Sequence, residues 1–181
     1  YTEQQRKYLA SILSLRGNAE DEISQTIKRV RVDMNPHQVD AAVFAIQSPI
    51  SAGVVLADEV GLGKTIEASL VIAQKWAERK RRILLVVPAS LRKQWSQELA
   101  EKFTLPSTII ETKSFNSAIK AKVLNPFDQE GSVVICSYQF GSAKSEFVAR
   151  VPWDLVVYDE AHKLRNVYKK DGSKIAKRLR A

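Results

Sequence analysis

Apolar residues recur along the chain with two different spacings. Residues 2–15 and 19–32 both show helical spacing, and Gly17-Asn18 separates them. Within the second stretch the apolar positions recur at intervals of four and three residues, as on a helix that docks by one face. The pattern therefore predicts an N-terminal helical extension over residues 1–32.

After residue 32, short β-branched runs alternate with helical stretches. The predicted strands are residues 54–57, 83–87, 108–110, 133–136 and 155–158. The predicted helices are residues 65–79, 90–103, 115–124 and 139–148, and a surface loop is expected at 125–131. Strands that alternate with helices form right-handed βαβ units. Residues 33–181 are therefore expected to form an α/β domain with a mainly parallel sheet covered on both faces.

Length and composition narrow the class of protein. The 181 residues suffice for a domain with a sizeable core, and 45% hydrophobic with 27% charged residues is ordinary for a soluble globular protein. The longest apolar run, residues 83–89, is too short to span a membrane, and the polar start has no signal-peptide pattern. Cys136 is the only cysteine and lies in a predicted strand, which favours a buried, inert thiol. We expect a cytosolic protein, and the missing initiator methionine indicates a piece of a longer one.

The net charge of +8, from 28 basic and 20 acidic residues, is concentrated in two places. Arg79-Lys-Arg-Arg82 is expected to form one basic cluster with Arg92 and Lys93. Residues 163–180 hold eight basic residues and one acidic residue, Asp171. Basic clusters attract polyanions by releasing counterions, so nucleic acid is an expected partner. A solvated basic face explains the same charges equally well.

The segment Leu56-Ala-Asp-Glu-Val-Gly-Leu-Gly-Lys-Thr-Ile66 carries the strongest chemical signal. A glycine-rich turn between a strand and a helix lets backbone N–H groups converge on an anion at the helix N-terminus. Lys64 supplies a positive charge for the outer phosphates, and the Thr65 hydroxyl suits Mg²⁺. Asp58 stands where the general phosphate-loop pattern has its first glycine. A nucleotide is the expected ligand; the alternative is a structural turn that contains two glycines.

The last predicted strand ends at two adjacent carboxylates, Asp159 and Glu160. Parallel sheets bind ligands beyond the carboxyl ends of their strands, so this end should face the phosphate loop. Asp159 suits Mg²⁺, which prefers few carboxylates plus water and phosphate oxygens, and Glu160 is placed to polarise an attacking water. Helix N-capping is the alternative for the pair. His162 either couples the site to another surface or is a solvated histidine in the next helix.

The two segments Asp58-Glu-Val-Gly-Leu-Gly-Lys-Thr65 and Asp159-Glu-Ala-His162 together resemble motifs I and II of helicase superfamily two. The sequence around the first of these segments is especially similar to that of the Swi/Snf-type ATPases, above all their bacterial RNA-polymerase-associated members. This family has aspartate, as at Asp58, where the general pattern has its first glycine. The resemblance extends from about residue 34 to residue 166. It implies a three-layer α/β/α RecA-like lobe that binds ATP with Mg²⁺ and acts on nucleic acid, with double-stranded DNA favoured.

The same resemblance assigns roles to three further segments. Gln38 corresponds to a glutamine that reads adenine through its carboxamide. Residues 82–95 are similar to motif Ia, which contacts the nucleic-acid backbone in the family, and within it Trp95 is expected to be a core anchor. Residues 134–138 are similar to motif Ib, where a hydroxyl contacts the strand; Ser137 is almost as well explained as a plain strand-end hydroxyl.

The predicted site residues fall into four groups. The residues expected to be catalytic are Lys64, Asp159 and Glu160. The residues expected to bind nucleotide are Gln38, Asp58, Glu59, Val60, Gly61, Leu62, Gly63, Lys64, Thr65 and His162. The expected Mg²⁺ ligands are Thr65 and Asp159. The residues expected to contact nucleic acid are Pro88, Ser90, Arg92, Lys93, Ser137 and Tyr138.

The resemblance also implies parts that residues 167–181 do not match. Family members continue into a Ser/Thr-rich motif III and a second RecA-like lobe, which supplies an arginine to the transferred phosphate. Arg178 or Arg180 could replace that arginine, but a basic helix is the simpler interpretation. We therefore expect the first lobe of a translocating or remodelling ATPase, weakly active by itself. A phosphate-loop ATPase that acts on proteins and a non-catalytic interaction module stay open as alternatives.

Overall fold

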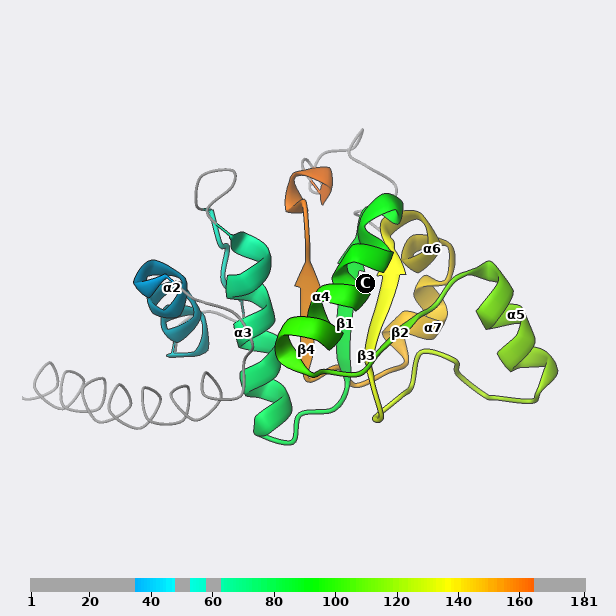
Figure 1. Ribbon diagram of the computed structural model, residues 1–181. Coiled ribbons are helices and arrows are strands. Elements are labelled where there is room, and N and C mark those ends of the chain that lie inside the picture. The colour runs from blue at the N-terminus through cyan, green and yellow to red at the C-terminus, as the bar shows by residue number, and fades with distance from the viewer. Residues whose placement is uncertain (1–34, 48–52, 58–62, 165–181) are drawn as a thin grey trace, which may run out of the picture. The chain divides into compact units, whose positions relative to one another are not determined.

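A computed structural model describes residues 35–47, 53–57 and 63–164 of the chain (Figure 1). The chain divides into two compact units, Tyr1–Glu78 and Arg79–Ala181. The helical extension predicted for residues 1–32 lies outside the described residues, and so do residues 165–180 of the basic stretch. No helix in the three described ranges is long and apolar enough to cross a membrane.

The described part of the first unit contains two helices that pack against each other, α2 (Pro36–Gln47) and α3 (Lys64–Ala77). Proline suits the first position of α2, because a fixed φ and a missing N–H cost nothing there. Gln38 lies in the first turn of α2 and is 6% exposed. Helix α3 begins one residue earlier than predicted and ends two residues earlier.

Residues 53–57 form neither a helix nor a strand, so the strand predicted at 54–57 is corrected. A strand exists through hydrogen bonds to a neighbouring strand, which the local sequence does not specify. Val55 is 82% exposed. A β-branched run alone therefore did not suffice to predict a strand here.

The second unit is built on four parallel strands: β1 (Ile83–Val87), β2 (Ser107–Ile109), β3 (Val133–Ser137) and β4 (Leu155–Tyr158). Their order in the sheet is β2-β3-β1-β4, and each lies within one residue of its predicted bounds. The chain moves from β1 outward to β2, returns through β3 and then crosses to the other side of β1. All four carboxyl ends consequently meet at one edge of the sheet.

Helices cover both faces of this sheet, which confirms the predicted α/β fold with a mainly parallel sheet. The 3₁₀ turn η1 (Ala89–Leu91) leads into α4 (Arg92–Phe103), and α6 (Tyr138–Ala143) leads into α7 (Ser145–Ala149). Figure 1 shows α4 in front of the sheet and α6 and α7 behind it. Because crossovers between parallel strands are right-handed, the reversal in strand order places the helices on opposite faces.

Two predicted helices differ from those observed. Helix α5 (Thr112–Lys120) starts three residues early, because Glu111 and Ser114 form a reciprocal capping box at its N-terminus. The helix predicted at 139–148 is interrupted at Lys144, which ends α6 and precedes α7. Glycine and serine within this stretch are weaker helix formers than alanine or leucine, so the helical pattern there was easily broken.

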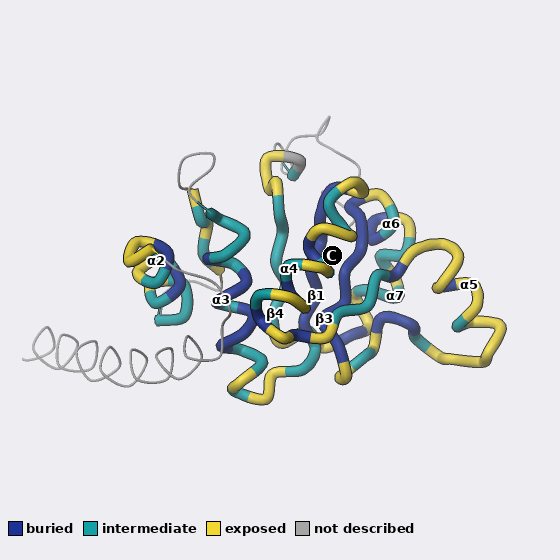
Figure 2. The backbone as a smooth tube through the Cα atoms, in the orientation of Figure 1, coloured by how far each residue is buried: buried dark blue, intermediate teal, exposed yellow. Residues whose placement is uncertain are grey.

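Strands β1 and β3 are buried along their whole length, whereas β4 is half-buried (Figure 2). The core on one face of the sheet combines residues of these strands with aromatic residues from outside it. Phe127, from the loop predicted at the surface, is fully buried beside Phe115, at 6.1 Å between ring centroids. The loop at 125–131 is present, but the prediction missed that Phe127 anchors it in the core.

Candidate functional site

The phosphate-loop residues that the structure describes are Gly63, Lys64 and Thr65, whereas residues 58–62 lie outside its range. Gly63 is the N-cap of α3 with φ 93°, and its carbonyl accepts hydrogen bonds from the N–H groups of Ile66 at 2.8 Å and Glu67 at 3.2 Å. Lys64 and Thr65 therefore form the first two positions of a 14-residue helix. A helix N-terminus carries positive partial charge and suits a phosphate.

Gln38 lies directly against Gly63 within the first unit. A Cβ atom added at Gly63 would collide with Nε2 of Gln38, so glycine is required here for space as well as for its positive φ. The Gln38 Oε1 atom accepts a hydrogen bond from the Asn35 N–H at 3.1 Å. The residue predicted to read adenine thus lies beside the start of the helix predicted to hold phosphate, and its adenine role stays a prediction.

Asp159 follows β4 directly and is held by four hydrogen bonds. Its N–H donates to the Val86 carbonyl of β1 at 3.0 Å, and its carbonyl accepts from the Tyr138 hydroxyl at 2.6 Å. The side chain accepts from the Trp95 indole at Oδ2, at 2.8 Å, and from the Glu160 N–H at Oδ1, at 2.9 Å. The carboxylate predicted to hold Mg²⁺ is therefore fixed at the carboxyl edge of the sheet.

Tyr138 remains a hydrogen-bond donor because its environment keeps the phenol neutral. Burial raises the pKa of Tyr138, and the Asp159 carboxylate raises it further, since a second negative charge nearby is unfavourable. The hydroxyl therefore keeps its proton over the whole working pH range. Tyr138 is 1% exposed, and its predicted contact with nucleic acid stays a prediction.

Glu160 has a backbone conformation that is rare for a residue with a side chain, at φ 55°. The other described non-glycine residues with positive φ lie at or just after the ends of helices, where this conformation is common. The Glu160 carboxylate is exposed and lies 2.9 Å from Nδ1 of His162. Both side chains are accessible to solvent, and this geometry is consistent with both interpretations of His162.

Within the described residues, the acidic pair is followed by η2, a four-residue 3₁₀ turn (Ala161–Leu164). Oδ1 of Asp159 accepts from the next residue in the chain, and Oδ2 accepts from α4. The partners of this carboxylate are thus the amide of the next residue and a distant indole, whereas an N-cap side chain accepts from the N–H two or three residues further along the chain.

Residues predicted to contact nucleic acid lie at the carboxyl ends of β1 and β3. An open groove of about 560 Å³ at this edge brings Arg92 and Ser137 together. Arg92 donates to the Ala89 carbonyl and to Glu111, both at 3.0 Å. The groove is lined by Arg92, Glu111, Thr112, Lys113, Ser137, Gln139, Phe140 and Ala143.

The predicted nucleic-acid contacts differ in accessibility. Ser90 and Lys93 are exposed, whereas Pro88 and Ser137 are buried. The Ser137 hydroxyl caps α6 by accepting the Phe140 N–H at 3.2 Å. The strand-end interpretation of Ser137 thus has a structural basis, while its contact with nucleic acid stays a prediction.

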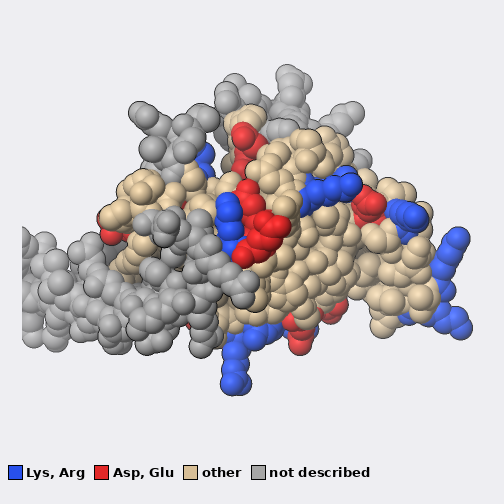
Figure 3. All heavy atoms as spheres, viewed as in Figure 1, with Lys and Arg blue, Asp and Glu red and all other residues tan. Residues whose placement is uncertain are grey.

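The basic cluster predicted from sequence is not one cluster. Residues 79–82 precede β1, whereas Arg92 and Lys93 follow it, and five residues of strand separate the two groups by about 16 Å at 3.3 Å per residue. On the face that Figure 3 shows, basic and acidic side chains of the described residues are interspersed and form no continuous basic surface. Charge counted along the sequence therefore overstated the local positive surface.

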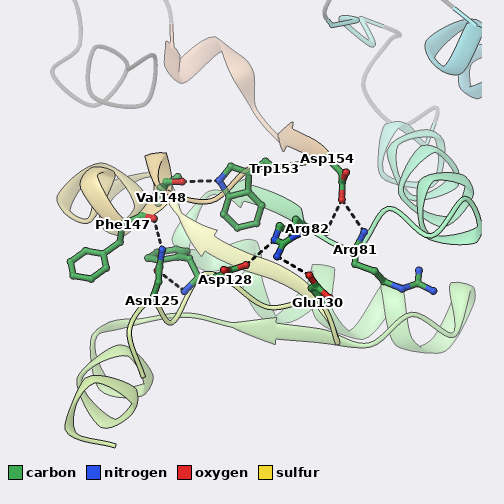
Figure 4. Close-up of polar contacts among 10 residues, drawn as sticks. Arg81, Arg82, Asn125, Asp128, Glu130, Phe147, Val148, Trp153 and Asp154 are labelled. Carbon is green, nitrogen blue, oxygen red and sulfur yellow. Dashed lines mark hydrogen bonds and ion pairs between the residues drawn. The ribbon is translucent and has the colours of Figure 1, made fainter. Parts of the chain in front are cut away.

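Arg82 is neutralised by two carboxylates (Figure 4). Its guanidinium contacts Asp128 at 2.9 Å and Glu130 at 2.7 Å, and the hydrogen bond with Asp128 raises the pKa of Arg82. The N–H groups of Arg81 and Arg82 donate to Oδ2 of Asp154 at 3.0 and 3.1 Å. This network ties loop 125–131 and the start of β4 to the start of β1, at the edge opposite Asp159.

Sequence reasoning missed the contact between Trp95 and Asp159. The predicted core-anchor role is confirmed, since Trp95 is 3% exposed. A buried indole N–H usually finds an acceptor, so a carboxylate partner could have been sought. The sequence offered no means of choosing among the acceptors, because 64 positions separate the two residues.

Oxygen donors of the kind that Mg²⁺ prefers are present in both units, as the Thr65 hydroxyl and the Asp159 carboxylate. Within the described ranges no group of three or more His, Cys, Asp or Glu residues could hold a metal. Mg²⁺ at nucleotides needs no such group, since water and phosphate oxygens complete its shell. Taken separately, the hydroxyl and the carboxylate each have the chemistry of a ligand for Mg²⁺ bound together with a nucleotide.

The SNF2-related domain family matches residues 5–181. The RNA polymerase-associated protein RapA of Yersinia pseudotuberculosis serotype O:1b (strain IP 31758) is 40% identical over 142 residues, which cover 76% of this chain and 14% of RapA. RapA of Yersinia pestis (strain Pestoides F) is 40% identical over 140 residues, which cover 75% of this chain and 14% of that protein. The chain thus spans about a seventh of these relatives.

A solved structure has a similar fold. The Sulfolobus solfataricus SWI2/SNF2 ATPase core in complex with dsDNA aligns with a TM-score of 0.67 at 21% identity. The alignment covers 83% of this chain and 30% of that one.

Proposed function

Because the chain belongs to the SNF2-related domain family, we propose that it is the ATP-binding lobe of a nucleic-acid-dependent ATPase of the Swi/Snf type. The observation that carries the proposal is the fixed position of Asp159 at the carboxyl edge of a parallel sheet, where α/β folds bind their ligands. The start of α3 at Lys64 and Thr65 supports it independently.

The proposed reaction is the attack of water on the γ-phosphate of ATP. Lys64 and the backbone N–H groups at the start of α3 stabilise the negative charge of the phosphates. Thr65 and Asp159 are the residues that would hold Mg²⁺, and the bound ion would neutralise phosphate charge. Glu160 orients the attacking water, and His162, 2.9 Å from its carboxylate, limits the movement of that side chain. Gln38 binds the adenine through its carboxamide.

Double-stranded DNA is the proposed partner, contacted at the groove that is lined by the starts of α4 and α5, the end of β3 and α6. Lys113 and the exposed Lys93 give this edge positive charge, and Arg92 is a third basic group there, paired with Glu111 at 3.0 Å. Support also comes from the similarity in fold to an ATPase core solved with dsDNA and from relatives named for association with RNA polymerase. ATP hydrolysis would then drive movement on DNA or remodelling of protein–DNA complexes, together with a second RecA-like lobe.

Salt-dependent DNA binding tests the proposed partner. The chain should bind duplex DNA with an affinity that falls as salt rises, and R92A/K93A should reduce the slope of log affinity against log salt by about 2, one per lost phosphate contact. The double variant K80A/K120A removes the same charge from other parts of the second unit and should keep the wild-type slope. Binding that is insensitive to salt, or equal binding to a neutral polymer, would favour an ATPase that acts on proteins.

A further inference from the structure

Trp95 is the only side chain from outside the segment 159–160 that contacts the Asp159 carboxylate among the described residues. Its ring is buried at the start of α4, and Nε1 donates to Oδ2 at 2.8 Å. The contacts of Val86 and Tyr138 act on the backbone of Asp159 and leave the torsion of its side chain free. The direction in which the carboxylate points therefore depends on the indole at Oδ2 and on the Glu160 N–H at Oδ1, and of these two donors only the indole comes from another element.

An indole N–H is well suited to orient a carboxylate that must also bind a cation. It donates one hydrogen bond, accepts none and carries no charge at any working pH. A carboxylate offers about four lone-pair sites, so one hydrogen bond at each oxygen leaves sites open on both. Lysine or arginine in the same place would compete with the cation, whereas the indole N–H does not.

We propose that Trp95 is a positioning residue that holds the Asp159 carboxylate in the orientation in which it takes Mg²⁺ with the nucleotide. The inference rests on the proposed function of Asp159 and adds a second residue to the same site. Hydrogen-bond partners behind a metal ligand typically change metal affinity by about 10–100-fold when they are removed.

Trp153 provides a matched control within the same unit. Its indole Nε1 donates to the backbone carbonyl of Val148 at 2.9 Å, on the side of the sheet edge where β4 begins (Figure 4). Replacing either tryptophan by phenylalanine removes one indole N–H and keeps an aromatic ring. The two variants therefore differ in whether the lost partner is Asp159.

The test is the affinity of the 181-residue chain for a non-hydrolysable ATP analogue, measured by calorimetry with Mg²⁺ and with EDTA. The wild type and W153F should bind more tightly with Mg²⁺. In W95F the ratio of the affinity with Mg²⁺ to the affinity in EDTA should be about tenfold smaller than in the wild type, while the affinity in EDTA stays unchanged. A general loss of structure would lower both affinities, so the split between the two conditions isolates the positioning role.

The possible outcomes separate the two hypotheses. A wild type without any gain from Mg²⁺ contradicts the proposed function, whereas a gain that W95F retains in full contradicts only the role of Trp95. If W95F does not fold, the indole N–H signals of the ¹⁵N-labelled D159A variant decide. The Trp95 signal should move upfield relative to wild type while the Trp153 signal stays; an unmoved Trp95 signal overturns the inference.

Discussion

At the scale of single residues, the two ends of the proposed site are constrained in different ways. Gly63 is required by its positive φ and by the close approach of Gln38. Asp159 is constrained by hydrogen bonds from β1, α4 and α6. The backbone requirement at Gly63 is visible in the sequence, because it calls for a glycine. The hydrogen bonds that hold Asp159 come from distant segments, so the sequence around Asp159 does not reveal them.

Cys136 gives a prediction about pH at this scale. Burial raises the pKa of Cys136 from its ordinary value of 9.0 to about 12, because the thiolate is poorly solvated inside β3. The folded state thus holds the proton more tightly than the unfolded state. This contribution to stability is fully present below pH 9.0 and is lost as pH rises towards about 12.

Alkylation with iodoacetamide measures the same property. At mildly alkaline pH the Cys136 thiol of the folded chain should react far more slowly than that of the chain in denaturant. The unfolding free energy should fall as pH rises from 9.0 towards about 12. Equal alkylation rates for the folded and unfolded chain would contradict the burial of this thiol.

At the scale of elements, the end of β3 shows how a strand is joined to the next helix. Ser137 ends the strand, and its hydroxyl accepts a hydrogen bond from the Phe140 N–H, which has no partner within the first turn of α6. Because α6 has six residues, this cap contributes a large share of its local stability. Ser137 was also predicted to contact nucleic acid. Its removal should lower stability if it acts as the cap of α6, and should weaken DNA binding if it acts as a contact.

S137A should lower the unfolding free energy by about 1 kcal/mol, the usual cost of losing a serine N-cap. Denaturant unfolding measures this difference. S90A is the control, since Ser90 is exposed at the same edge and should leave stability unchanged. If S137A weakens DNA binding without loss of stability, the capping role is not the main one.

The sequence predicted the elements of the second unit better than those of the first. Strands β1 and β3 were predictable because both are central and buried, so their apolar runs are continuous. Residues 54–57 have a similar composition, but pairing depends on a partner that local sequence does not specify. Helix α2 was missed, and the break at Lys144 depends on tertiary contacts.

The candidate site divides in the same way. Lys64 and Thr65 were predicted at a helix start, and Asp159 and Glu160 at a strand end, because both motifs have fixed spacing; the structure places them there. The partners of Asp159 could not be predicted, since they come from distant segments. The basic cluster failed because β1 carries residues 79–82 and Arg92 to opposite edges of the sheet.

At the scale of the whole molecule, the edges of the second unit differ in their polar contacts. At the edge where β1 and β4 begin, Arg82 forms ion pairs with Asp128 and Glu130. The opposite edge carries Asp159 and the groove. Arg82 is therefore expected to stabilise the fold, and ligand binding is expected at the other edge.

A polypeptide of these 181 residues should hydrolyse ATP slowly, with or without duplex DNA. The resemblance to superfamily-two enzymes implies an arginine from a second lobe, and such an arginine is worth about 10³–10⁵ in turnover. Phosphate release measured with and without DNA checks this expectation. Robust DNA-stimulated turnover would show that the 181 residues already contain all catalytic groups.

Nucleotide binding at the start of α3 is the central claim, and K64A tests it most directly. ATP titration should show measurable binding by the wild type and no binding by K64A, because Lys64 supplies the positive charge for the outer phosphates. The control K75A removes a lysine from the last turn of the same helix and should bind like the wild type. Wild-type affinity in K64A would contradict the account.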